Sequence, residues 1–151
     1  MRYVYWGLAL FLALIIQSRL SLLGVSPNLT VLLAYFAGIR YGNTKGLFIG
    51  ALIGAIEDSV SSSFLGPHML SKGIVGYAAS FMISGGFFRW TPVLGMILLS
   101  VLTLTDNAIG FISRTLFDKM PDALSTMFFI SIMQSLLNAP AGIFLRPSDE
   151  E

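Results

Sequence analysis

Long apolar segments follow one another along almost the whole chain, separated only by short polar stretches. Of the 151 residues, 55% are hydrophobic and only 11% are charged, whereas a soluble domain carries roughly 25% charged residues. The chain therefore lacks the charged side chains that would cover a water-facing surface of this size. We expect an all-α, polytopic integral membrane protein that folds as a single transmembrane domain over residues 1–151.

Hydropathy predicts a bundle of about six transmembrane helices, since a span needs ~20 apolar residues. The first segment has the basic start and apolar core of a signal peptide, but no small-x-small cleavage site follows, so we expect a retained span. Prolines support four helix starts, because a proline in the first turn loses no helical hydrogen bond. These prolines are Pro27, Pro67, Pro92 and Pro121. The expected helices cover residues 3–23, 27–40, 45–63, 67–84, 92–113 and 122–144.

An even number of spans places both termini on one side of the membrane. Basic residues favour the cytoplasm for that side. With the termini inside, the inner basic residues are Arg2, Arg40, Lys45, Arg89 and Arg146, and the outer ones are Arg19, Arg114 and Lys119. The basic residues form no run, so we expect no nucleic-acid partner. The absence of cysteine excludes disulfides and a cysteine-ligated zinc site.

Glycines recur at every fourth residue from Gly38 to Gly54, and the series leads into two adjacent acids, Glu57 and Asp58. In lipid, helices associate by close packing, which small side chains permit. Steps of four residues keep a stripe on one helix face with a drift of only ~40° per step. We predict that the glycines contact a neighbouring helix or a partner and that both acids flank this contact. The glycines in question are Gly42, Gly46, Gly50 and Gly54.

A matching stripe occupies the next expected helix, where Lys72, Gly76, Ser80 and Ser84 stand four apart. A short connection predicts that the two helices form an antiparallel hairpin. Asp58 and Lys72 would then lie at equal depth, roughly 6–8 Å below the outer surface. This arrangement predicts an ion pair between Asp58 and Lys72 that sets the register of the hairpin. The alternative is that the acids reach water near the interface and Lys72 extends outward to it.

Further polar side chains lie in the fifth and sixth expected helices. Asp106 lies roughly 10 Å from the outer end of its helix. It could contact Gln134 or Arg114, or carry a proton and donate a hydrogen bond. A structural or partner contact is the favoured interpretation of Asp106, and a proton relay is the alternative.

The sequence contains no motif with catalytic spacing. His68, the only histidine, lies at an expected turn without a nucleophile motif beside it. Glu57 and Asp58 point about 100° apart on a helix, which does not suit the two carboxylates of a glycosidase. No phosphate-binding loop and no HExxH motif is present. We expect a protein that is not an enzyme and that has no cofactor or catalytic metal.

Residues 26–84 resemble the MreD family of bacterial rod shape-determining proteins. The family pattern has a proline that opens the second span, glycines that lead to an aspartate, a leucine–glycine turn, and a glycine–tyrosine pair in the next span. One departure is the acidic doublet Glu57–Asp58, where the family pattern centres on one aspartate. The matching positions are Pro27, Tyr35, Arg40, Gly42, Gly46, Gly50, Asp58, Leu65, Gly66, Gly76 and Tyr77.

This resemblance implies a small bacterial inner-membrane protein whose fold is similar to that of the S-components of energy-coupling-factor transporters. It implies a non-catalytic scaffold of the cell-wall elongation machinery that binds MreC and helps to organise peptidoglycan synthesis along the lateral wall. The implied partners also include RodA, the elongation-class penicillin-binding protein and, indirectly, MreB, together with membrane lipids. Ala9 and Ala13 form a small-xxx-small pair in the first span that could contact the anchor helix of MreC, or could reflect ordinary apolar composition.

Two other functions remain open. In the first, the chain is an S-component-like subunit that binds a small molecule for uptake, with Glu57, Asp58 and Lys72 near an outer pocket; the short outer loops argue against it. The second is a small channel or proton-coupled transporter. It rests on Asp106 alone, and no inverted repeat supports it.

Overall fold

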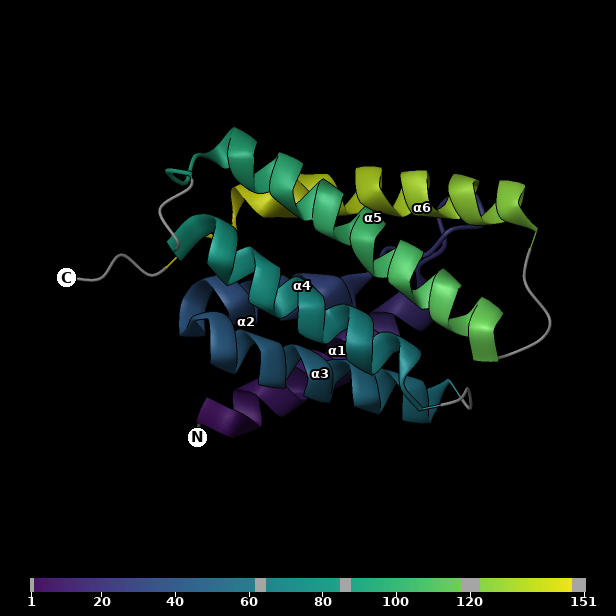
Figure 1. Ribbon diagram of the computed structural model, residues 1–151, viewed down its shortest axis with the longest axis horizontal. Coiled ribbons are helices and arrows are strands. Elements are labelled where there is room, and N and C mark those ends of the chain that lie inside the picture. Colours follow the sequence, from purple (N-terminus) through teal and green to yellow (C-terminus); the bar gives the residue numbers. More distant parts are fainter. Residues whose placement is uncertain (1, 62–64, 85–87, 118–122, 148–151) are drawn as a thin grey trace.

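The computed structural model describes residues 2–61, 65–84, 88–117 and 123–147, and every element in these ranges is helical (Figure 1). Each of the segments expected from hydropathy contains one α-helix, so the all-helical prediction is confirmed. The helices are α1 (Arg2–Arg19), α2 (Leu29–Tyr41), α3 (Asn43–Val60), α4 (Pro67–Ser84), α5 (Pro92–Phe117) and α6 (Leu124–Asn138), and a 3₁₀-helix, η1 (Ala139–Ile143), follows α6.

Prolines mark two of the helix starts as predicted, because Pro67 and Pro92 are the first residues of α4 and α5. At the start of α2 the prediction is off by two residues. There Asn28 is the N-cap, and its side chain accepts a hydrogen bond from the backbone N–H of Val31. The expected role of Pro121 concerns a residue outside the described part of the chain.

The first helix ends at Arg19, earlier than the predicted residue 23. The chain turns sharply after it, since Leu23 and Gly24 have φ angles of 56° and 80°. A left-handed backbone of this kind cannot continue an α-helix, and it brings Leu22 and Val25 together through paired backbone hydrogen bonds.

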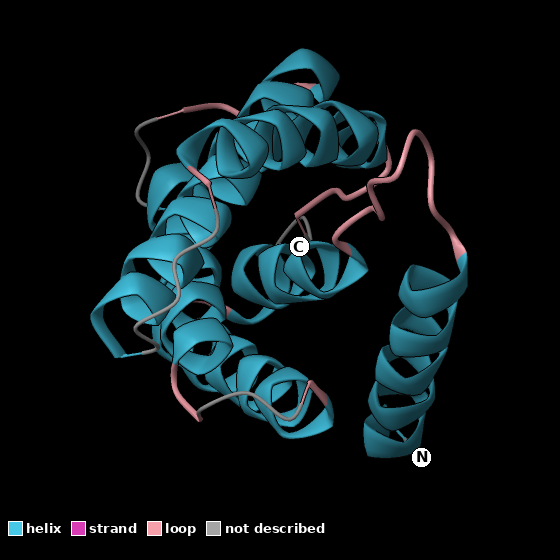
Figure 2. Cartoon of the chain, turned by 90° about the vertical axis from the view of Figure 1, so that its right-hand side faces the viewer, coloured by secondary structure: helices cyan, strands magenta, loops and turns pink. Residues whose placement is uncertain are grey.

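Successive helices run in alternate directions along the long axis, so the first residues of α1 and the end of η1 lie at the same end of the molecule (Figure 1). Helices α3 and α4 form the most extensive contact; α2 packs against both of them, α5 packs against α4, and α6 with η1 packs against α5. Helix α1 contacts mainly α2, and in Figure 2 it stands apart from the other helices.

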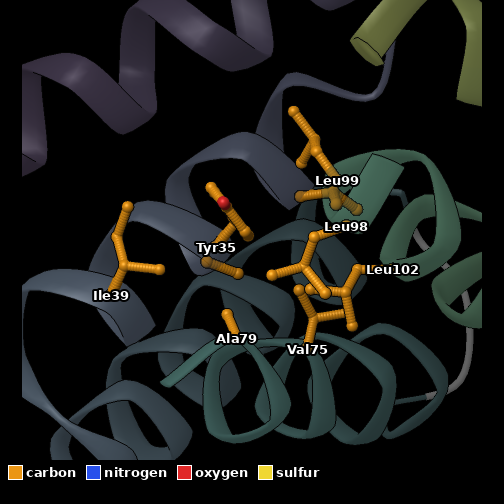
Figure 3. Packing of buried hydrophobic residues seen from close by; sticks show 9 residues of the cluster. Tyr35, Ile39, Val75, Ala79, Leu98, Leu99 and Leu102 are labelled. Carbon is orange, nitrogen blue, oxygen red and sulfur yellow. The ribbon is translucent and has the colours of Figure 1, made fainter. Parts of the chain in front are cut away.

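The apolar core lies where α2, α4 and α5 meet (Figure 3). Its members point inward from these three helices, and many large apolar side chains on the outer faces remain exposed, among them Phe48, Leu52 and Phe128. A soluble monomer rarely exposes so much contiguous apolar surface. The core residues are Val31, Ala34, Tyr35, Ile39, Val75, Ala79, Leu98, Leu99 and Leu102.

Glycines let the backbones of α3 and α4 touch. A Cβ added at Gly46 would lie 2.6 Å from the carbonyl oxygen of Gly76, closer than real Cβ contacts. A Cβ at Gly50 or Gly54 would likewise collide with the α4 carbonyl oxygens of Lys72 or His68. These positions must therefore be glycine for the two helices to lie this close together.

The prediction that Gly42 belongs to the same contact is wrong. Gly42 lies in the turn between α2 and α3 with φ of 88°, and a Cβ added there would have no neighbour within 4 Å. Its conformation, rather than its size, explains a glycine at this position. A second close approach was not predicted: Gly95 of α5 and Gly142 of η1 face each other's carbonyl oxygens.

By length and composition, two described stretches are apolar enough to cross a membrane, Pro92–Phe117 and Leu124–Ile143. Val4–Arg19 and Leu29–Tyr41 are shorter apolar helices. Helix α3 contains three charged residues and three glycines, and α4 contains Lys72 and several small residues, which lowers their hydropathy. The bundle of six spans remains a prediction.

Replacing Gly50 by Ala will destabilise the protein, because the added methyl group would force α3 and α4 apart. Overpacking of this kind costs about 1–3 kcal/mol. The control is Gly7→Ala in α1, where the same methyl group would meet nothing within 4 Å. Thermal unfolding in detergent should show a lower midpoint for Gly50→Ala only; equal midpoints would contradict the close contact at Gly50.

Candidate functional site

A fully buried lysine lies inside the bundle, near the start of α4. Lys72 of α4 has an exposed fraction of 0%, and its ammonium group lies 2.7 Å from Oε2 of Glu57 in α3 and 3.5 Å from Oδ2 of Asp106 in α5. Both carboxylates are themselves buried, with exposed fractions of 6% and 2%. An isolated charge would be very costly at this position, so the ion pairs are a condition of burying it.

The two carboxylates receive further hydrogen bonds from helices α1 and α2. The hydroxyl of Thr30 donates to Oε2 of Glu57 at 2.8 Å, and the amide of Gln17 donates to Oε1 at 3.5 Å. The amide of Asn28 donates to Oδ2 of Asp106 at 2.9 Å. Charge-assisted hydrogen bonds of this kind are stronger than neutral ones.

Asn28 also connects this group of residues to α6. Its backbone carbonyl accepts a hydrogen bond from the amide of Asn138 at 3.1 Å, and the same amide lies 3.2 Å from the hydroxyl oxygen of Thr103. Each of the six α-helices, or the residue that caps it, thus contributes a polar side chain. We call this set the buried charge cluster: Gln17, Asn28, Thr30, Glu57, Lys72, Asp106 and Asn138.

Asp58 has a different role, and the predicted Asp58–Lys72 ion pair is wrong. Its carboxylate accepts hydrogen bonds from the backbone N–H groups of Gly66, His68 and Met69, at 2.9, 3.1 and 3.1 Å. These are donors at the start of α4 that no carbonyl of the helix can satisfy. Asp58 therefore caps α4, where the helix dipole also favours a negative charge, and Glu57 is the acid of the doublet that faces Lys72.

His68 and Arg114 extend the polar contacts from the buried charge cluster to the surface. Nδ1 of His68 lies 3.4 Å from the ammonium of Lys72, and its Nε2 lies 2.6 Å from the exposed guanidinium of Arg114. A guanidinium and an ammonium can only donate, so one neutral imidazole cannot accept from both. With Nε2 accepting from Arg114, Nδ1 carries the ring proton and its approach to Lys72 is a contact without a hydrogen bond.

The predicted contacts of Asp106 with Gln134 or Arg114 are also wrong. Its neighbour Asn107 donates to the side-chain oxygen of Gln134 at 2.9 Å, and Gln134 in turn donates to the carbonyl of Ser26 at 2.9 Å. Asp106 faces the other side of α5, toward Asn28 and Lys72. One residue along a helix is a rotation of about 100°, which separates these two sets of contacts.

The small pair of α1 faces the interior of the protein. Ala13 is buried and Ala9 is half-buried, beside the buried Leu10. The glycines of α3 are likewise covered by α4. Neither set of small residues presents a free surface in this structure.

The buried charge cluster combines an ion triad with amide and hydroxyl groups, and the carboxylate of Glu57 that accepts from Thr30 is also paired with Lys72. In the described part of the chain, no group of three histidine, cysteine or acidic side chains could hold a metal ion. Within the cluster, two buried oxygens have no hydrogen-bond partner among the described residues, Oδ1 of Asp106 and Oδ1 of Asn138. The arrangement can fix the positions of six helices relative to one another.

Sequence reasoning missed Asn28 and Thr30, which act from the start of α2. The signal that could have found them is the stretch SPNLT, in which an asparagine follows a proline and precedes a helical apolar run, as an N-cap does. Gln17 and Asn138 were visible as polar residues in apolar segments, but nothing in the sequence gives their partners.

The fold and the site define a small all-helical protein with apolar outer faces and charge buried at its centre, as in polytopic membrane proteins. The model of the family described as rod shape-determining protein MreD matches residues 1–147, so the chain belongs to the MreD family. Members of this family are bacterial inner-membrane proteins with a role in determining rod shape, which confirms the resemblance seen in the sequence. Neither a curated protein nor a solved structure matches the chain, so the likeness to S-components remains a prediction.

A double-mutant cycle will show which acid is coupled to Lys72. Lys72→Met leaves two buried carboxylates without their cation, a loss that costs about 3–5 kcal/mol. Paired with Glu57→Gln, it should show a coupling energy of about 0.5–3 kcal/mol in unfolding. The effects of Lys72→Met and Asp58→Asn on the free energy of unfolding should be close to additive. Coupling between Lys72 and Asp58, with additivity between Lys72 and Glu57, would support the Asp58–Lys72 ion pair instead.

Loss of the cap at Asp58 will loosen the first turn of α4. Asp58→Ala should lower the free energy of unfolding by about 0.5–2 kcal/mol and speed hydrogen exchange at the amides of Gly66, His68 and Met69. The matched control is Ser59→Ala, since the hydroxyl of Ser59 is exposed and bonds only to the carbonyl of Ala55 in its own helix. Unchanged exchange at these three amides would contradict the capping role.

Proposed function

We propose that the protein is a non-catalytic scaffold of the rod-shape machinery. It spans the inner membrane six times with both termini in the cytoplasm, binds MreC, and helps to organise peptidoglycan synthesis along the lateral wall. RodA and the elongation-class penicillin-binding protein are proposed associates, and MreB is an indirect one. Membership of the MreD family supports the rod-shape role.

The observation that carries the scaffold proposal is the buried charge cluster. Its charges pair with one another inside the chain, and its hydrogen bonds join all six α-helices. A buried ion triad of this kind is weak as a source of stability but can specify one arrangement of helices. A fixed arrangement is what a protein needs when its task is to hold partners in place.

The outer faces of the helices are where partners would bind. Because α4 covers the glycines of α3, these glycines are not accessible to the anchor helix of MreC. The exposed apolar face of α1, with Val4, Leu8 and Phe11, is a better candidate. Helix α1 has few contacts within the chain, which leaves most of its circumference for a partner or lipid.

The alternative of an S-component-like subunit has less support. It needs Glu57, Asp58 and Lys72 to face a ligand. In the structure, Glu57 pairs with Lys72, and Asp58 caps α4. A ligand would have to break these contacts before binding. A thermal-shift screen of the purified protein against vitamins would favour this alternative if one of them raised the midpoint.

Purification from native membranes will test the scaffold proposal. The tagged chain, extracted in mild detergent, should retain MreC, whereas a tagged membrane protein of unrelated function, expressed at the same level, should not. Deletion in a rod-shaped host should give rounded cells that the wild-type chain restores to rods. Normal rods after a clean deletion would count against the proposal, even if MreC were recovered.

A further inference from the structure

A groove of ≈ 500 Å³ lies between α1 and α3. Trp6 and Gly7 line it from α1, and α3 lines it from Lys45 to Ile56. It exists because α1 contacts mainly α2 and stands apart from the other helices (Figure 2). Gly7 widens it, since a Cβ added to Gly7 would meet no atom within 4 Å. Its volume falls in the range of ~300–1,000 Å³ that is typical of ligand sites.

One end of the groove is polar and positively charged, and the rest is apolar. Lys45 lies there in the first turn of α3, exposed and without an ion pair among the described residues. Beside it, the indole N–H of Trp6 donates to the hydroxyl of Tyr41 at 3.0 Å. Arg40, also exposed, lies in the last turn of α2 next to Tyr41, with its guanidinium 5.9 Å from the ring centroid of Phe36. Tryptophan, tyrosine and basic side chains are typical of the membrane–water interface.

The length of the groove distinguishes between occupants. From Lys45 to Ile56 the chain advances eleven residues along α3, which is ~16 Å at 1.5 Å per residue. The hydrocarbon core of a bilayer is ~30 Å thick, so the groove extends through about one leaflet. A transmembrane partner helix would need a contact along the whole thickness. A single acyl chain below a headgroup matches one leaflet.

We propose that this groove binds an acyl chain of an anionic phospholipid, whose phosphate lies at Lys45 and Arg40. The apolar wall of α3 and the open space at Gly7 accept the chain, and the two cations select a negatively charged headgroup. Binding would fill the space between α1 and α3 and so fix the position of α1. This site is a property of the chain alone and does not depend on MreC.

Quenching of Trp6 fluorescence will test the proposal. The chain has two tryptophans, so the variant Trp90→Phe leaves Trp6 as the only one. This variant is reconstituted into phosphatidylcholine vesicles with increasing amounts of a phospholipid brominated on its acyl chain, either phosphatidylglycerol or phosphatidylcholine. Brominated phosphatidylglycerol should reach half-maximal quenching at a mole fraction several-fold lower than brominated phosphatidylcholine.

Substitutions in the groove separate the headgroup from the acyl chain. Lys45→Gln should reduce the preference for phosphatidylglycerol by about fivefold, the effect of one interfacial cation, and Arg40→Gln should reduce it further. Gly7→Leu should fill the groove and weaken the saturable quenching by both lipids. Arg19→Gln, at the other end of α1, should change nothing.

Three results would overturn the proposal. They are equal quenching by the two lipids, a preference that survives the removal of both cations, and quenching that Gly7→Leu leaves unchanged. If co-reconstituted MreC relieved the quenching and headgroup charge had no effect, the groove would belong to a partner helix. Failure of MreC to co-purify would bear on the scaffold proposal and leave the lipid site standing.

Discussion

The ion triad of Glu57, Lys72 and Asp106 is the interaction on which the rest of the structure depends. A lysine with no exposed surface needs its two carboxylates within contact distance, and each carboxylate receives a further hydrogen bond, Glu57 from Thr30 and Asp106 from Asn28. Three helices therefore have to meet at one level before any of these charges is satisfied. Removal of one partner leaves a buried charge, which costs more than the ion pair itself contributes.

Close packing by glycine makes this triad possible. Gly50 lies against the carbonyl oxygen of Lys72, and Gly54 lies against that of His68. With larger side chains at these positions, α3 and α4 would separate and Glu57 could not keep its 2.7 Å contact with the ammonium. Helix spacing and charge pairing thus support each other, and Asp58 fixes the same hairpin at its end by capping α4.

Much of the fold could be predicted from the sequence, because hydropathy and proline report on single helices. Pro67 and Pro92 begin α4 and α5, and the four-residue spacing of glycines identifies the face that α3 turns to its neighbour. A glycine required for its small size looks the same in sequence as one required for positive φ. The spacing therefore predicts that Gly42 belongs to the contact between α3 and α4, whereas it lies in the turn between α2 and α3 with positive φ.

The pairing of the charges could not be predicted in the same way. Lys72 had two adjacent acids within reach, and the outcome depends on a competition that sequence does not show: unpaired backbone N–H groups at the start of α4 take Asp58, which leaves Glu57 for the ammonium. Asp106 enters the triad from a helix far along the chain. Partners of this kind depend on tertiary packing, and hydropathy carries no information about it.

The turn that precedes α2 has a consequence for the order in which the chain can assemble. The carbonyls of Ser26 and Asn28 receive their hydrogen bonds from Gln134 and Asn138, which follow 108 and 110 residues later. At about 5–20 residues per second, a ribosome needs roughly 5–20 seconds to make that stretch, and a bare carbonyl is costly inside hydrocarbon for all that time. In a membrane-spanning bundle, we therefore expect this turn to stay at the aqueous surface until α6 is in place. A nascent chain that stops short of α6 would lack Gln134 and Asn138 and so would leave both carbonyls unpaired.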